Sequence, residues 1–174
     1  VRMRVREQLM RGASQIKLTA GGGVSSPNSP LDAITFTEAE LRAAVEAAGF
    51  FGLWVNEVAG ADALGMLAAA AEVTTNLTLA TGVIPVDRRP GAEIAAHVAA
   101  LGLPADRLMI GIGSGKPGLG SIARVEEAIA EIRQASTARI LVGALGPRMR
   151  QLAAERADGA LLSWLTPPVA AAQA

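Results

Sequence analysis

The sequence predicts an α/β protein built from parallel βα repeats, with about six strands. Three observations support this fold class. Short apolar runs alternate along the chain with alanine-rich amphipathic segments, and the starts of these runs lie roughly 20 to 37 residues apart, which is the span of a βα unit. No Asn-Gly hairpin signal separates them. Right-handed crossovers between such strands give either a doubly wound sheet or a piece of a (βα) barrel.

The expected strands are rich in Val, Ile and Leu, as suits parallel strands that are covered on both faces. In chain order they are Gln15–Thr19, Gly52–Glu57, Leu77–Val83, Arg107–Ile112, Ala138–Gly143 and Gly159–Trp164.

The expected helices are recognised by their start signals, which are capping side chains and first-turn prolines. Thr37 and Glu40 form a capping box, Asp62 and Ser121 precede two further helices, and Pro90 and Pro147 fit the first turn of two more. The helices expected are Arg2–Arg11, Glu38–Ala48, Ala63–Val73, Pro90–Ala100, Ile122–Ala135 and Pro147–Arg156.

Composition narrows the class of protein. The 174 residues suit a single domain, 51% of them are apolar but only 3% are aromatic, and 16 basic residues balance 16 acidic ones. No basic block with interleaved aromatics indicates nucleic acid, and no apolar run reaches the roughly 18 residues of a membrane helix. The absence of cysteine excludes disulfides and thiolate metal sites. We therefore expect a soluble cytoplasmic protein that binds neither nucleic acid nor membrane.

The stretch from Arg107 to Lys116 is an apolar strand that runs into a glycine loop. Gly111, Gly113 and Gly115 alternate with larger residues, and backbone N–H groups of such a loop can lie against an anionic group. The alternative is that these glycines only permit tight packing at a strand end. The spacing is not that of the dinucleotide-binding fingerprint.

Residues 49–167 resemble the luciferase-like monooxygenase family, which includes deazaflavin-dependent oxidoreductases. The stretches that carry the resemblance begin at Gly52 (GLWVNE), Asp62 (DALGMLAAAAE), Leu77 (LTLATGV), Gly111 (GIGSG), Gly143 (GALGPR) and Ala157 (ADGALLSW). Members of that family are eight-stranded barrels, so the resemblance implies that a middle section is missing between Gly120 and Ala138 and that the chain is a truncated TIM barrel.

Residues 1–48 resemble a different family, the metal-dependent amidohydrolases of the imidazolonepropionase and dipeptidase type. Val5-Arg-Glu-Gln-Leu, the stretch from Gly12 to Leu18 and the stretch from Gly21 to Asp32 carry this resemblance, and Lys17 stands where that family carboxylates a metal-bridging lysine. Together the two resemblances imply a chimeric barrel with an amidohydrolase-like segment 1–48 and a monooxygenase-like segment 49–174 in one α/β domain.

The luciferase-like resemblance implies a cofactor site at the strand ends, for FMN or the deazaflavin coenzyme F420, with hydride passing between its ring and a small-molecule substrate. Asn56 and Glu57 would be the polar, catalytic neighbours of the ring. The segment behind the ring often contains a non-proline cis peptide in that family. The residues implied to bind the cofactor are Thr81, Gly82 and Val83 behind the ring, Gly113, Ser114 and Gly115 along its tail, and Ala144, Gly146 and Pro147 at a helix N-terminus that favours phosphate.

Each of these positions also has a purely structural interpretation, and two other functions remain open. The chain can be a non-catalytic or weakly active scaffold, or a hydrolase of activated esters or phosphate esters that uses Lys17 or a strand-end carboxylate. We expect no metal, because the single histidine, His97, has no second ligand at helical spacing. The cluster Asp87–Arg89 is expected to be a solvated loop, and Trp54 and Trp164 are expected to lie in the core. An incomplete barrel exposes apolar edges, so we expect a homo-oligomer.

Overall fold

The structure is a computed structural model that describes residue 10 and residues 51–58, 60–116 and 118–163. All helices and strands named below belong to one unit of the chain, Gly52–Ala174. Three expected features lie outside the described residues: the strand Gln15–Thr19 with Lys17, the helix Glu38–Ala48 with its capping box, and nearly all of the helix Arg2–Arg11.

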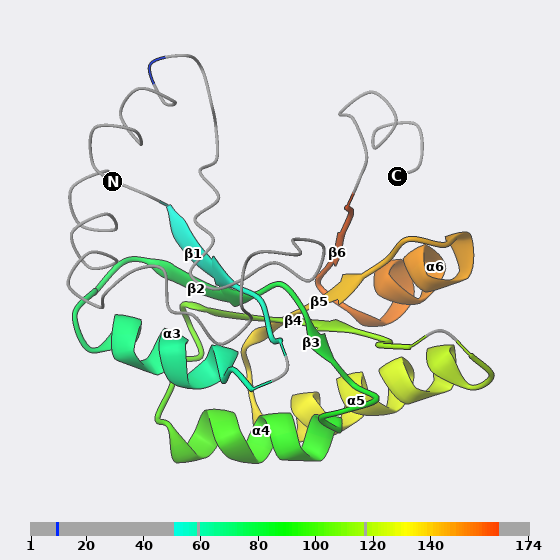
Figure 1. Ribbon diagram of the computed structural model, residues 1–174, viewed down its shortest axis with the longest axis horizontal. Helices are drawn as coiled ribbons and strands as arrows, with labels where there is room; N and C mark the ends of the chain where they lie inside the picture. The colour runs from blue at the N-terminus through cyan, green and yellow to red at the C-terminus, as the bar shows by residue number, and fades with distance from the viewer. Residues whose placement is uncertain (1–9, 11–50, 59, 117, 164–174) are drawn as a thin grey trace. The chain divides into compact units, whose positions relative to one another are not determined.

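The described part of the chain contains one parallel sheet of six strands (Figure 1). Five of them lie in the order β1-β2-β4-β5-β6, and β3 pairs with the last residues of β4, beyond the point where β2 leaves it. The α/β fold class with parallel strands is thereby confirmed. The strands are β1 (Gly52–Val55), β2 (Thr78–Thr81), β3 (Ile84–Pro85), β4 (Leu108–Gly113), β5 (Arg139–Gly143) and β6 (Gly159–Leu161).

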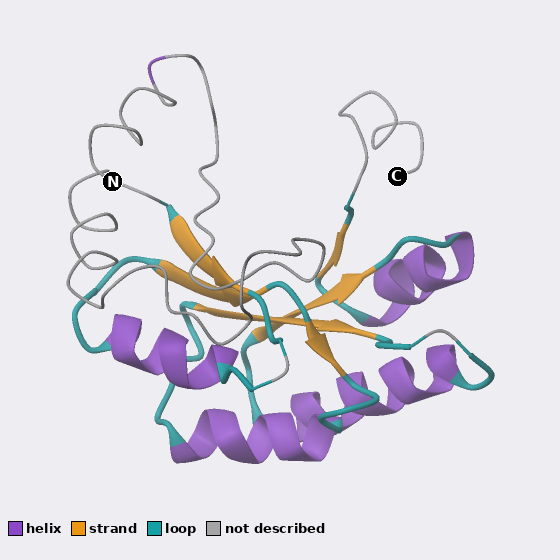
Figure 2. Ribbon diagram, viewed as in Figure 1, coloured by secondary structure: helices purple, strands orange, loops and turns teal. Residues whose placement is uncertain are grey.

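Four helices connect these strands and lie along one face of the sheet, as Figure 2 shows. They are α3 (Ala63–Ala71), α4 (Gly91–Ala100), α5 (Ser121–Ala135) and α6 (Pro147–Arg156). Helix α6 has the predicted bounds. Helix α4 starts one residue later than predicted, so Pro90 precedes the helix instead of occupying its first turn. None of the helices in this described part is long and apolar enough to span a membrane.

The core lies between the sheet and these helices. Strand residues that pair across the sheet present rows of apolar side chains on the helix side, where they are almost completely buried. Burying each such side chain stabilises the fold by about 1.5–3 kcal/mol. The rows are Leu79 with Leu108, Ile110 with Ile140, and Ile112 with Val142.

The connection from β4 to β5 is an ordinary βα unit. Helix α5 begins shortly after Gly120 and ends before Ala138, and the two strands that it joins pair directly with each other. The stretch where the family resemblance implied a missing section is therefore closed by a single helix, and the sheet continues across it without an interruption in pairing.

Candidate functional site

The predicted site residues gather at one edge of the sheet. Because β1, β2, β4 and β5 are parallel neighbours, their C-terminal ends meet at this edge, which we call the C-terminal edge. Asn56 directly follows β1, Gly82 follows β2, Ser114 follows β4 and Ala144 follows β5. Open parallel sheets bind ligands at this edge, so the placement agrees with a shared site.

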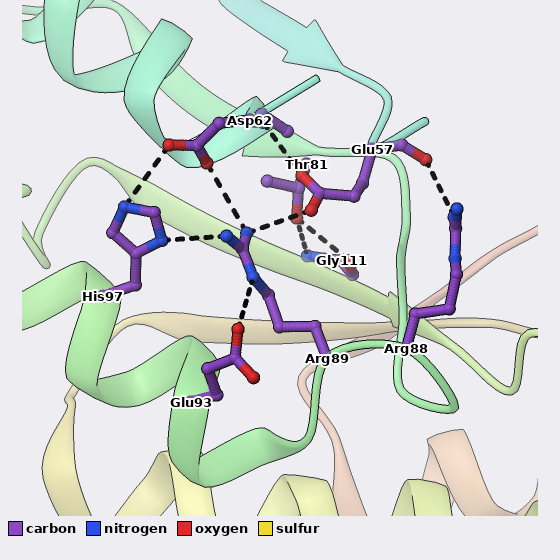
Figure 3. A network of polar contacts seen from close by, with 9 residues as sticks. Glu57, Asp62, Thr81, Arg88, Arg89, Glu93, His97 and Gly111 are labelled. Atoms are coloured by element: carbon purple, nitrogen blue, oxygen red, sulfur yellow. Dashed lines mark hydrogen bonds and ion pairs between the residues drawn. The ribbon is translucent and has the colours of Figure 1, made fainter. Parts of the chain in front are cut away.

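The chain bends sharply between β2 and β3, and Thr81 holds the bend. Its buried hydroxyl donates a hydrogen bond to the carbonyl oxygen of Gly111 (2.9 Å) and accepts one from the N–H of Gly111 (2.8 Å) (Figure 3). The hydroxyl of Thr81 thus bonds the backbone groups of Gly111 in β4 at the point where β2 and β4 separate. The next N–H, of Gly82, donates to the carbonyl oxygen of Val55 (2.9 Å). The Gly82–Val83 peptide bond is cis, as the luciferase-like resemblance implied for this segment.

Val83 fills the space above the ends of β4 and β5. A methyl group at Gly113 would lie 2.8 Å from Cγ2 of Val83, and one at Gly143 would lie 3.3 Å from Cγ1 of the same residue. A methyl group at Gly111 would meet the carbonyl oxygen of Thr81. Of the two interpretations of the glycine strand end, close packing therefore accounts for Gly111 and Gly113.

The turn at Gly115 already holds an anionic group of the protein itself. Gly115 has a φ of +71°, and a side chain there would collide with the carboxylate of Asp87. Oδ2 of Asp87 accepts a hydrogen bond from the N–H of Lys116 (2.9 Å). A carboxylate from the loop after β3 therefore occupies the turn that follows the glycine-rich strand end.

The N-terminus of α6 is open. Gly146 caps the helix with an extended backbone (φ −99°, ψ 159°), and no described residue lies within 4 Å of the point where its side chain would begin. No side chain from the described part of the chain makes a capping hydrogen bond at this end, and Pro147 occupies the first turn. The N–H groups of Arg148 and Met149 have no intrahelical acceptor, as at any helix start, and they point with the positive end of the helix dipole toward an incoming anion.

Asn56 is exposed and faces the bend. Its Oδ1 would lie 3.6 Å from a methyl group at Gly82, and the ring atom Cε3 of Trp54 would lie 3.4 Å from the same point. Trp54 is 44% exposed, so the prediction that it belongs to the core is wrong. It failed because Trp54 points to the face of the sheet opposite the helices. Trp164 lies outside the described residues.

Glu57, in the loop after β1, and Arg89, just before α4, form the centre of an ion-pair network (Figure 3). Oε1 of Glu57 lies 3.0 Å from Nη1 of Arg89, and both side chains are largely buried, at 12% and 15% exposure. Arg89 also reaches Oδ1 of Asp62 (3.5 Å) and Oε1 of Glu93 (3.4 Å). Arg89 is thus enclosed by carboxylates, which corrects the prediction that it lies in a solvated loop.

The second carboxylate oxygen of Glu57 caps helix α3. Oε2 accepts a hydrogen bond from the N–H of Ala63 (2.9 Å), whereas Asp62 makes no capping hydrogen bond with its side chain. The prediction that Asp62 caps this helix is therefore wrong: its carboxylate instead pairs with Arg89 and His97.

His97 links Arg89 to Asp62. Nδ1 of His97 lies 3.0 Å from Nη2 of Arg89, and Nε2 lies 3.3 Å from Oδ2 of Asp62. A guanidinium can only donate, so Nδ1 accepts, and the ring carries its proton on Nε2, where it faces the carboxylate. No local sequence pattern predicts this network, because its members lie up to 40 residues apart.

A cavity of about 490 Å³ adjoins the network, and Glu57, Asp62, Arg88, Arg89 and Glu93 contribute to its lining. Among the described lining residues, three carboxylates face two guanidinium groups, and Arg89 forms an ion pair with each of the three carboxylates. Among the residues that the structure describes, no three His, Cys, Asp or Glu side chains are grouped as they would be to hold a metal ion.

Known structures resemble this fold. The coenzyme F420 dependent tetrahydromethanopterin reductase of Methanopyrus kandleri superposes with a TM-score of 0.59 at 21% identity, over 67% of this chain and 49% of that one. The monooxygenase RslO1 of Streptomyces bottropensis gives a TM-score of 0.57 at 21% identity, over 68% and 50% of the two chains. The present chain spans about half the length of these proteins. A search among curated proteins returned no match.

The comparisons give no support to an amidohydrolase-like segment or to a chimera of two lineages. The sequence profile of the luciferase-like monooxygenases matches residues 16–122, so the match begins well inside the segment 1–48 that we assigned to amidohydrolases. Most of the segment 1–48 is thus matched by the luciferase-like profile and not by an amidohydrolase pattern. The profile covers more than half of the chain, and the chain belongs to the luciferase-like monooxygenase family.

Proposed function

We propose that this chain binds FMN or coenzyme F420 at the C-terminal edge of the sheet and takes part in hydride transfer to or from a small organic substrate. One observation carries the proposal. Asn56, the bend at Gly82, the turn after β4 and the open N-terminus of α6 all lie at the ends of parallel strands that follow one another in the sheet.

The donors at this edge suit a ring with a phosphate-bearing tail. The phosphate would lie at the start of α6, where two backbone N–H groups and the helix dipole favour an anion and Gly146 leaves space. The turn at Gly115 is a weaker candidate for the phosphate, because Asp87 would have to leave it. Ser114, between this turn and β4, would then contact the middle of the tail.

When bound, either cofactor supplies a ring that accepts and returns a hydride. The residues of this chain would orient that ring. The amide of Asn56 is exposed at the bend and can both donate to and accept from ring heteroatoms. Glu57 is already held by Arg89 and by the N–H of Ala63, so we assign it a positioning role: it fixes the loop that carries Asn56.

A matched pair of substitutions at Gly146 tests the proposed phosphate position. Asp and Asn are both favourable capping residues, and the extended backbone at Gly146 accepts either, so both variants should fold. Only Gly146→Asp adds a negative charge where the phosphate would lie. We expect it to weaken FMN binding by about tenfold relative to Gly146→Asn.

Equilibrium dialysis and absorbance titration with FMN and F420 measure the binding. Riboflavin, which has the same ring but no phosphate, serves as the control ligand and should bind both variants equally. If the wild-type protein binds neither FMN nor F420 at millimolar ligand, the proposed function is wrong. If both variants bind FMN equally well, the phosphate position is wrong.

A second candidate is a folded scaffold without catalysis, and two contacts favour it. Asp87 occupies the glycine turn, and the carboxylate of Glu57 is engaged by an arginine and a helix start. Both carboxylates are therefore engaged in contacts that hold the fold together. Turnover of reduced FMN or reduced F420 with a small carbonyl or imine acceptor would exclude this candidate, and tight cofactor binding without turnover would support it.

A further inference from the structure

Trp54 is a large aromatic side chain in an unusual place. It lies in β1, one residue before the strand ends, and 44% of it is exposed. In the sheet it pairs with Ala80, which pairs with Met109, and this row faces away from the helices. A tryptophan normally buries most of its surface, so its exposure here points to a surface that a ligand or partner completes.

The surroundings of Trp54 limit what that ligand can be. The neighbouring positions on this face are small, with Ala80 beside the indole and Gly82 at the bend, where a methyl group would touch both the indole and the amide of Asn56. A flat apolar surface thus borders a side chain that donates and accepts hydrogen bonds. This combination suits a planar heteroaromatic ring, which presents an apolar face and polar edges at the same time.

We propose that the indole of Trp54 forms one wall of the ring site and contacts the face of the isoalloxazine or deazaflavin ring, while the amide of Asn56 meets its polar edge. This inference rests on the proposed function and adds to it a residue that selects for the ring rather than for the phosphate. Ring and phosphate are then recognised by separate parts of the sheet edge: Trp54 near the end of β1 and the start of α6 after β5.

The test uses the two tryptophans of the chain. In a Trp164→Phe background, Trp54 is the single tryptophan, and its emission reports directly on contact with a ring. Titration with riboflavin and with FMN should quench it along saturable curves whose midpoints agree with dialysis. Trp54→Leu should weaken riboflavin and FMN by the same factor, about threefold to tenfold, and Trp54→Phe by less.

Met66→Leu is the matched control, because Met66 is a partly exposed apolar residue of α3, on the helix side of the sheet. It should leave both affinities unchanged, and circular dichroism should show the same fold in every variant. The Gly146→Asp variant gives the opposite pattern, with FMN weakened and riboflavin unaffected.

Two results would overturn the inference while leaving the proposed function intact. One is FMN binding by dialysis with no change in Trp54 emission and no loss in Trp54→Leu. The other is emission from Trp54 that changes with protein concentration but not with FMN, which would mean that a second copy covers this face. Absence of any FMN or F420 binding to the wild-type chain would instead remove the proposed function, and the role of Trp54 with it.

Discussion

Arg89 links the loop after β1 to helix α4, because its guanidinium contacts acidic side chains on both. Glu57 and Asp62 belong to the loop, whereas Glu93 belongs to the helix. Arg89 is only 15% exposed, so its removal would leave the carboxylate of Glu57 largely buried and without its cation. The loop that carries Asn56 depends on this arrangement for its position.

Arg89→Ala should therefore lower the free energy of unfolding by about 1–3 kcal/mol, the usual cost of leaving a buried polar partner unsatisfied. Urea denaturation followed by circular dichroism measures the change. Arg88→Ala is the control: Arg88 is exposed and makes a long hydrogen bond (3.5 Å) to the carbonyl oxygen of Glu57, so its loss should cost no more than about 0.5 kcal/mol. Equal losses in the two variants would contradict a central role for Arg89.

Thr81 offers a second test on a single side chain. Thr81→Val keeps the shape but removes a hydroxyl that bonds both backbone groups of Gly111, and it should destabilise the protein by about 1–3 kcal/mol. Thr81→Ser keeps the hydroxyl and should recover most of this loss. Thermal melts of the three proteins decide the matter. A serine variant no more stable than the valine variant would show that the methyl group, and not the hydroxyl, holds the bend.

The turn between α6 and β6 depends on one carboxylate. Oδ2 of Asp158 accepts hydrogen bonds from the N–H of Ile140 (2.7 Å) and from Arg133 (3.1 Å), and so joins the start of β6 to β5. The hydrogen bond from Ile140 and the nearby arginine lower the pKa of Asp158 below its ordinary value of 3.8, against a smaller opposing effect of burial. The ionised form of Asp158 is thus favoured by folding.

This shift predicts a definite pH dependence. A carboxyl whose pKa is lower in the folded state stabilises the fold above its unfolded-state pKa, and the contribution disappears as the pH falls through the folded-state value. Asp158→Asn should therefore melt below the wild type at neutral pH, and the two melting temperatures should converge as the pH drops below 3.8. Because the side chain is 36% exposed, we expect a modest difference. A gap that persists at low pH would contradict the assigned cause.

Helix and strand positions followed from the sequence where local signals coincide. Helix α6 has the predicted bounds because Pro147 fixes its first turn and the apolar run of β6 follows directly after it. Strand β3 was missed because it is only two residues long and contains Pro85, which usually argues against a strand. Strands β1 and β2 were predicted to be too long. The structure ends β1 before Asn56 and Glu57, and it ends β2 before Gly82 and Val83.

The place of the candidate site was predictable, whereas its internal contacts were not. Parallel strands bring their C-terminal ends together whatever the side chains are, so Asn56, Ser114 and Gly146 could be assigned to one edge. Asp87 contacts the turn at Gly115 although the two lie almost 30 positions apart in the sequence, and no local sequence pattern predicts such a contact. Whether a glycine makes room for a ligand or for the protein itself depends on these distant partners.

Taken as a whole, the described sheet has two outer strands, β1 and β6. Outer strands present unpaired backbone groups, and natural proteins usually cover them. We therefore expect the chain to associate with copies of itself. Native mass spectrometry of the purified protein should show a dimer or a larger assembly, and the same spectrum would reveal a retained cofactor. A monomer that persists as the protein concentration rises would contradict this expectation.

The side chain of Val83 lies where a side chain at Gly113 or at Gly143 would begin. The residues allowed at these three positions therefore depend on one another. A mutation that adds even a methyl group at Gly113 needs a smaller side chain at Val83 to make room. Among relatives that share this bend, these positions should change together, with alanine at one accompanied by a trimmed side chain at the other. Substitutions at this end of the sheet should therefore be accepted in pairs more readily than singly.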